Sequence, residues 1–67
     1  MTQPKYITEI EVSEITGRAL STLRNERSKG EGIIYIKVGR SVRYDLQDVI
    51  DFMESHKIQT ENFWESQ

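Results

Sequence analysis

Four glycines divide the N-terminal part of this 67-residue chain into short segments. Gly17 follows a capped helical pattern, and Gly30 and Gly32 interrupt the polar segment after it. Gly39 stands between two runs rich in β-branched residues and tyrosine. Glycine readily adopts the left-handed conformation that ends helices and forms tight turns. We therefore expect two short helices before Gly30 and a β-hairpin around Gly39.

The first expected helix has a clear start and a clear end. Thr8 and Glu11 have the spacing of a capping box, and Ile7 and Val12 flank it as a hydrophobic staple. Gly17 is well placed to end this helix after about two turns. The side expected to be buried, with Val12, holds the two other apolar residues, Ile10 and Ile15, and the side expected to face water holds Glu9, Glu11 and Glu14.

The second expected helix begins near Ala19–Ser21 and runs to about Lys29. Its only candidates for burial are Ala19, Leu20 and Leu23. The other side chains are mostly hydrogen-bond donors: Ser21, Thr22, Arg24, Asn25, Arg27 and Ser28. Core packing alone explains such a helix poorly. We expect one edge of it to pack on the first helix and the other edge to face a partner.

The register of the expected hairpin follows from parity, because cross-strand partners share a face. A two-residue loop would mix apolar and polar side chains by pairing Val38 with Ser41 and Ile36 with Arg43. A three-residue loop, residues 39–41, would gather the apolar side chains on one face: Ile34, Ile36, Val38, Val42 and Tyr44. The opposite face would then be cationic, with Tyr35, Lys37 and Arg43, and with Arg40 at the tip. We therefore expect the three-residue loop.

A third helix is expected after Asp45, which can cap it with Asp48 in the reciprocal position. Its apolar side chains recur at helical spacing and close the core: Leu46, Val49, Ile50, Phe52 and Met53. The order of elements predicts an α+β fold, a small winged helix-turn-helix, over residues 1–57. The tail, residues 58–67, carries Phe63 and Trp64, which either fold back on the domain or bind another copy.

The net charge of −2 conceals a strong asymmetry. Residues 17–43 contain seven basic and two acidic side chains, a net of +5, and the rest of the chain has a net of −7. Such a distribution is typical of a phosphate-binding face on an otherwise acidic body. The alternative is a solvated middle segment that is basic without binding anything.

Helix-turn-helix proteins place their second helix in the major groove of DNA. Arginine pairs with guanine and asparagine with adenine, so Arg24 and Asn25 are the first candidates for base contact. Ser21 and Thr22, at the helix start, suit phosphate oxygens. Basic residues of the hairpin suit backbone or minor-groove contact. The full set of candidate DNA-binding residues is Arg18, Ser21, Thr22, Arg24, Asn25, Arg27, Lys37, Arg40 and Arg43.

About 48 of the 67 residues, from Tyr6 to Met53, resemble the excisionase-type DNA-binding domain, a relative of the MerR-like winged helix. The matching stretches are residues 7–12 (ITEIEV), 21–27 (STLRNER), 35–44 (YIKVGRSVRY) and 48–53 (DVIDFM). The resemblance implies a small phage, prophage or mobile-element protein that binds double-stranded DNA beside recombination sites or regulates transcription. The expected partners are double-stranded DNA, other copies of the chain side by side on it, and a recombinase.

The chain departs from that family's pattern at two positions. Many relatives have Ser or Thr where Ala19 stands and an aromatic residue where Glu26 stands. The resemblance therefore does not say how the second helix is capped or where Glu26 points. For Glu26 the sequence leaves three roles open, which are a bond to Arg27, a bond to Lys29, and contact with a cytosine amine.

Other classes of protein are disfavoured. The chain has no cysteine for disulfides or a cysteine-based zinc site, and its longest apolar stretch, Ile33–Ile36, is too short to span a bilayer. Met1–Lys5 is polar with no signal-peptide core, so we expect a cytoplasmic protein without a cofactor.

An enzyme is also not expected, because no nucleophile–base pair, phosphate loop or metal-ligand cluster stands out in the sequence. The carboxylates of the third helix, Asp48, Asp51 and Glu54, are most simply a solvated face, and His56 suits a helix C-terminus. The alternative function is a protein-interaction module, adaptor or antitoxin-like, that uses the second helix and the tail.

Overall fold

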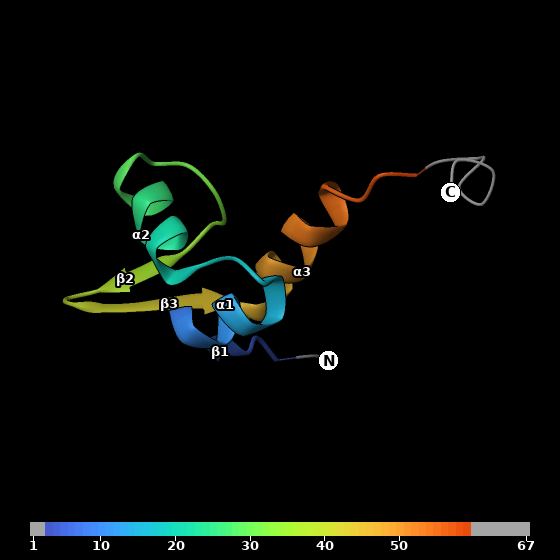
Figure 1. Cartoon of the computed structure of the whole chain (residues 1–67). Coiled ribbons are helices and arrows are strands. Elements are labelled where there is room, and N and C mark those ends of the chain that lie inside the picture. The colour runs from blue at the N-terminus through green and yellow to red at the C-terminus, as the bar shows by residue number, and fades with distance from the viewer. Residues whose placement is uncertain (1–2, 60–67) are drawn as a thin grey trace.

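The computed structural model describes residues 3–59. Within this range the chain forms three helices and an antiparallel sheet of strand order β1-β3-β2. The elements are β1 (Tyr6–Ile7), α1 (Glu9–Thr16), α2 (Leu20–Ser28), β2 (Ile36–Val38), β3 (Ser41–Asp45) and α3 (Leu46–Ser55). The expected α+β fold, with a helix-turn-helix and a hairpin wing, is confirmed. In Figure 1 the hairpin extends beyond α1 and α2 at one end, and α3 leads away at the other.

Helix α1 begins and ends as the sequence predicts. Thr8 Oγ1 accepts a hydrogen bond from Glu11 N at 3.2 Å, and Thr8 N donates to Glu11 Oε1 at 3.0 Å. Gly17 ends the helix at φ 74°, a conformation that a residue with a Cβ adopts only with strain. Ile7 and Val12, which flank the capping box, are both buried.

The prediction of which side of α1 is buried is wrong. Ile10 and Ile15 are 58% and 50% exposed, and Val12 is the buried residue of this helix. The inward side follows helical spacing through residues that are mostly polar: Glu9, Val12, Ser13 and Thr16. This side faces α2 and the turn before it, where polar groups are satisfied by local bonds, such as the 2.7 Å bond from Ser13 Oγ to Arg18 O.

The core is small and draws on every layer of the fold. Its buried members are Ile7, Val12, Leu23, Ile33, Tyr44 and Val49. Each helix therefore contributes one buried side chain, and Tyr44 from β3 lies among them. The partly buried residues packed around them are Leu20, Tyr35, Val42, Leu46 and Phe52. Ile50 and Met53 of α3, expected in the core, remain 41% and 39% exposed.

The hairpin has a two-residue turn, so the expected three-residue loop is wrong. Its pairs are Ile36 with Arg43, Lys37 with Val42, and Val38 with Ser41. Gly39 has φ 60°, which suits the first central position of a two-residue hairpin turn.

Consequently Lys37 shares a face with Val42, on the side of the buried Tyr44, while Arg43 lies on the opposite face. The apolar residues of β2 on that opposite face, Ile36 and Val38, are 38% and 71% exposed, and Ile34, two residues before the strand, is 70% exposed. Parity does not predict this register, because the most apolar face of the hairpin is not the face that is buried.

Strand β1 was not expected from the sequence, and it explains the face that β3 buries. Ile7 pairs with Tyr44 and Tyr6 with Asp45. Partners share a face, so the buried Ile7 and the buried Tyr44 set the inward side of the sheet. Two residues are too few to show a strand periodicity in the sequence.

Helices α2 and α3 have nearly the expected bounds but simpler caps. Ala19, the N-cap of α2, makes no side-chain hydrogen bond. Asp45 caps α3 by accepting from Gln47 N at 3.0 Å, and residues 3–59 show no return bond from Asp48. No helix in this range is long and apolar enough to cross a membrane. Phe63 and Trp64 of the expected tail lie outside the described residues.

Candidate nucleic-acid interface

An open groove of about 470 Å³ lies between α2 and the hairpin. Its lining residues are Arg24, Arg27, Ser28, Tyr35, Lys37, Gly39, Arg40 and Val42. Among these described residues four are basic and none is acidic. The groove therefore concentrates positive charge between the two elements that the sequence singled out.

The lining follows from helix spacing and strand register. Arg24, Arg27 and Ser28 lie three and four positions apart on α2, so they share one side of that helix. Lys37 reaches the groove because the two-residue turn pairs it with Val42. In the expected register Lys37 would have shared a face with Arg43 instead. The observed register therefore places Lys37 beside the arginines of α2 and leaves Arg43 outside the groove.

Glu9 of α1 joins the two groove arginines. Arg24 donates from Nη2 to Glu9 Oε2 at 2.8 Å and from Nε to Oε1 at 3.2 Å. Arg27 donates from Nη2 to the same Oε1 at 3.0 Å. Two guanidinium groups thus share one carboxylate, and the trio keeps a formal charge of +1. The sequence predicts that Glu9 faces water, but its side chain is only 22% exposed. Glu9 lies three positions before the buried Val12, and this helical spacing was the sequence signal that could have indicated its partial burial.

The two arginines of this trio are held differently. Arg27 also donates from Nη1 to Tyr44 Oη at 2.8 Å. Its guanidinium carbon lies 5.7 Å and 6.0 Å from the ring centres of Tyr35 and Tyr44, within cation–π range. The Arg27 side chain is 15% exposed and that of Arg24 is 58% exposed. Arg27 is therefore anchored against the sheet, whereas Arg24 lies mostly in solvent.

These contacts shift the pKa values of the trio. The hydrogen bonds from Arg24 lower the pKa of Glu9 to about 2; desolvation opposes this shift, and the bond from Arg27 adds to it. The bond to Glu9 raises the pKa of Arg24. For Arg27, desolvation acts to lower the pKa, but the bonds to Tyr44 and Glu9 outweigh it and the pKa is raised. All three groups are therefore charged at neutral pH.

Arg18 belongs to a second network, outside the groove. Its Nη2 pairs with Glu26 Oε2, and its guanidinium carbon lies 5.8 Å from the centre of the Phe52 ring. Of the roles left open for Glu26, neither Arg27 nor Lys29 is its ion-pair partner; the partner is Arg18. A Cβ at Gly32 would lie 2.8 Å from Glu26 Oε1, so glycine at this position makes room for the pair.

The remaining candidates fall into two groups. Ser21, Thr22 and Asn25 are exposed on α2. Arg43 is exposed on the outer face of the hairpin, where its Nη1 donates to Val42 O at 2.7 Å. The structure thus brings Arg24, Arg27, Lys37 and Arg40 together and leaves Arg18 and Arg43 apart from them.

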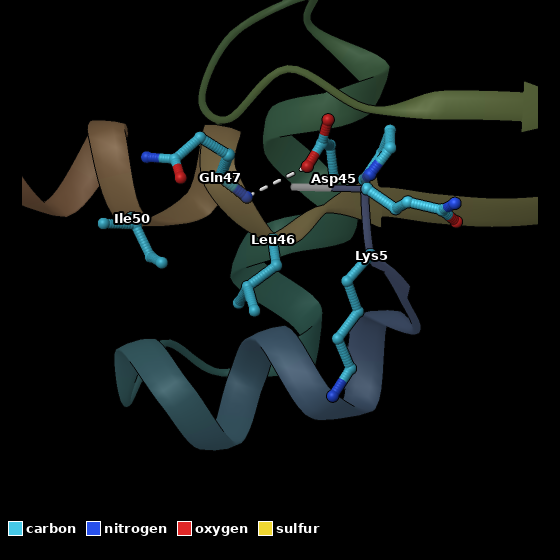
Figure 2. Close-up of a pocket in the computed structure, with 7 residues that line it drawn as sticks. Lys5, Asp45, Leu46, Gln47 and Ile50 are labelled. Carbon is cyan, nitrogen blue, oxygen red and sulfur yellow. Dashed lines mark hydrogen bonds between the residues drawn. The ribbon is translucent and has the colours of Figure 1, made fainter. Parts of the chain in front are cut away.

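A second hollow, of about 520 Å³, lies where the N-terminal segment meets α3 (Figure 2). Its lining is Gln3, Pro4, Lys5, Asp45, Leu46, Gln47 and Ile50. Figure 2 shows that its carboxylate, Asp45, is used to cap α3 through Gln47. The described residues also contain no cluster of three potential metal ligands. This hollow therefore offers a weaker case for a functional site than the basic groove.

No family model matches the chain, and neither the curated proteins nor the solved structures yielded a match. The resemblance to the excisionase-type domain stays a prediction.

Proposed function

We propose that this protein binds double-stranded DNA sequence-specifically, with α2 in the major groove and the hairpin against the neighbouring backbone. Its role would be that of an excisionase-like recombination directionality factor or a small transcriptional regulator. The observation that carries this proposal is the groove between α2 and the hairpin, with four basic lining residues and no acidic one among those described.

Two of the four basic residues are free to meet phosphate. Within residues 3–59 no ion pair involves Lys37 or Arg40, although the chain as a whole is acidic. Unpaired cations gathered in one groove raise the local potential and attract a polyanion. Lys37 and Arg40 are therefore the main candidates for contact with the DNA backbone.

Helix α2 has the exposed polar surface that base contact requires. Asn25 and Arg24 are exposed and can reach adenine and guanine edges in the major groove. Ser21 and Thr22 are exposed in the first turn, where Ala19 leaves the helix without a side-chain cap. Free amides and hydroxyl groups at a helix start suit a phosphate oxygen.

Lys37 and Arg43 offer a matched test, because they lie on neighbouring strands but on opposite faces. We expect Lys37→Ala to weaken duplex binding about eightfold at about 0.1 M salt and to reduce the salt slope by about 0.9, the loss of one phosphate contact. Arg43→Ala should change affinity by less than about twofold, since only long-range attraction is lost. Fluorescence anisotropy with duplexes selected from a random pool measures both effects.

The wild-type chain is the control in this experiment. Failure to bind any duplex at low salt contradicts the proposed function. Equal effects of the two substitutions contradict the placement of the site in the groove. Repeated motifs in the selected duplexes would show that several copies bind side by side.

A protein-interaction module is the alternative class, and the exposed apolar face of the hairpin favours it. Ile36 and Val38 on that face are 38% and 71% exposed. A change of Trp64 fluorescence with protein concentration, and none with added duplex, would support the alternative.

A further inference from the structure

Glu9 is, among the described residues, the carboxylate that contacts the groove arginines, and its two contacts are unequal. Arg27 is bonded to Tyr44 Oη as well as to Glu9 and is 15% exposed. Arg24 is 58% exposed and bonds no side chain in residues 3–59 other than Glu9. Arg24 can therefore leave Glu9 while Arg27 stays and keeps the carboxylate paired.

The geometry of the Glu9–Arg24 contact matches that of a base contact. Arg24 uses Nε and Nη2 on the two oxygens of Glu9, a two-point contact. Guanine offers arginine a similar pair of acceptors, O6 and N7, on its major-groove edge. Because the Arg24 side chain is 58% exposed and water already competes for its donors, a guanine in the right position can replace Glu9 as its partner.

Glu9 should affect the affinity for random-sequence DNA and the affinity for a duplex with the preferred sequence differently. Binding to random sequence depends mainly on how many phosphates the protein neutralises. Glu9 reduces the formal charge of the trio from +2 to +1, which weakens this electrostatic contribution. A contact with a base edge depends instead on hydrogen-bond geometry. Arg24 can make this contact once it has turned away from Glu9.

We infer that Glu9 is a specificity-determining residue, which holds Arg24 in the free protein, weakens binding to random DNA, and gives up Arg24 to a guanine edge. This inference rests on the DNA-binding function proposed above. It assigns a role in recognition to a residue of α1, which is not one of the two elements proposed to contact DNA, α2 and the hairpin.

The first test compares Glu9→Gln with Glu14→Gln, which removes the same charge from an exposed position of the same helix. Glu9→Gln should raise affinity for a random-sequence duplex about eightfold at about 0.1 M salt and steepen its salt slope by about 0.9. Affinity for the selected duplex should rise less, so the ratio of the two affinities falls by at least about threefold. Glu14→Gln should leave this ratio unchanged.

The outcomes separate the inference from the proposed function. If the wild-type protein binds DNA but Glu9→Gln changes both affinities equally, Glu9 does not set specificity and the inference is wrong. If the wild-type protein binds no duplex, the proposed function itself is wrong.

A second test needs no substitution, so it does not depend on how well Glu9→Gln folds. The Nε–H resonance of Arg24 in ¹⁵N-labelled wild-type protein reports the bond to Glu9. We expect it to shift when the selected duplex binds and to keep its position when the random duplex binds. The same shift with both duplexes, or no shift with the selected one, would overturn the inference.

Discussion

Two arginine networks involve α2, and they differ in both stoichiometry and exposure. On the groove side, Glu9 accepts hydrogen bonds from both Arg24 and Arg27, and Arg24 lies largely in solvent. In the other network, Arg18 and Glu26 pair one to one, with side chains 31% and 22% exposed. Arg18 Nε and Glu26 Oε1 are buried there without a hydrogen-bond partner.

This difference distinguishes the surface that we propose to bind DNA from a contact within the fold. The Glu9 network keeps an excess positive charge and an accessible donor group, which are what a polyanion requires. The Arg18–Glu26 pair is neutral and partly removed from water, so its main effect is to join the turn before α2 to the end of that helix. The sequence does not distinguish Arg18 from the two groove arginines, because all three belong to the same basic segment, residues 17–43.

The largest expected effect comes from the anchored member of the groove network. Arg27→Met keeps the apolar stem against the tyrosines but leaves Tyr44 Oη and part of Glu9 without a donor. We expect the free energy of unfolding to fall by about 2 kcal/mol, as when partly buried polar groups lose their partners. Urea denaturation measures this, and a loss below about 0.5 kcal/mol would show that Arg27 is not structurally important.

A pair of substitutions should separate the two networks, with smaller effects. Arg24→Ala should weaken binding to the selected duplex about tenfold through loss of a base contact, with little change in the urea midpoint. Arg18→Met should lower the free energy of unfolding by about 1 kcal/mol, because Glu26 loses its cation, and change DNA affinity less than about twofold. The reverse pattern would mean that the Arg18 network is the DNA-binding one.

The smallest expected effect is a pH dependence of stability specific to the groove network. The pKa of Glu9 is about 2 in the folded protein and 4.5 in its ordinary state. A carboxyl group whose pKa is lowered by folding stabilises the protein fully above its unfolded pKa, and this contribution is lost as pH falls toward the folded pKa. The melting temperature of the wild-type protein should therefore fall more steeply between pH 4.5 and 2 than that of Glu9→Gln. Parallel curves would show that the Glu9 contacts do not stabilise the fold.

The sequence predicted the features that depend on near neighbours. The Thr8–Glu11 capping box and the end of α1 at Gly17 are set within a few residues, and both formed as expected. The basic segment also indicated α2 and the hairpin as the elements of the candidate site. These signals are local, so a single sequence contains them.

Features that depend on distant partners could not be predicted in the same way. Ile10 and Ile15 fit an apolar stripe, but contact with α2 selected another side of α1. The face that β3 buries depended on β1, whose pairing with β3 places Tyr44 inward. The bonds of Glu9 to Arg24 and Arg27 join residues 15 and 18 positions apart, beyond the reach of any periodicity argument.

The exposed apolar side of the hairpin has a consequence for handling the protein. Strand β2 is an edge strand of the sheet, and Ile36 and Val38 lie on the outer face of the hairpin. An edge of this kind is where molecules add to one another and aggregate, and nearby cations oppose this by mutual repulsion. Lys37, Arg40 and Arg43 supply that repulsion around the turn. Substitutions of Lys37 or Arg40 that test the proposed DNA binding should therefore also lower solubility, so such variants are best compared at low concentration.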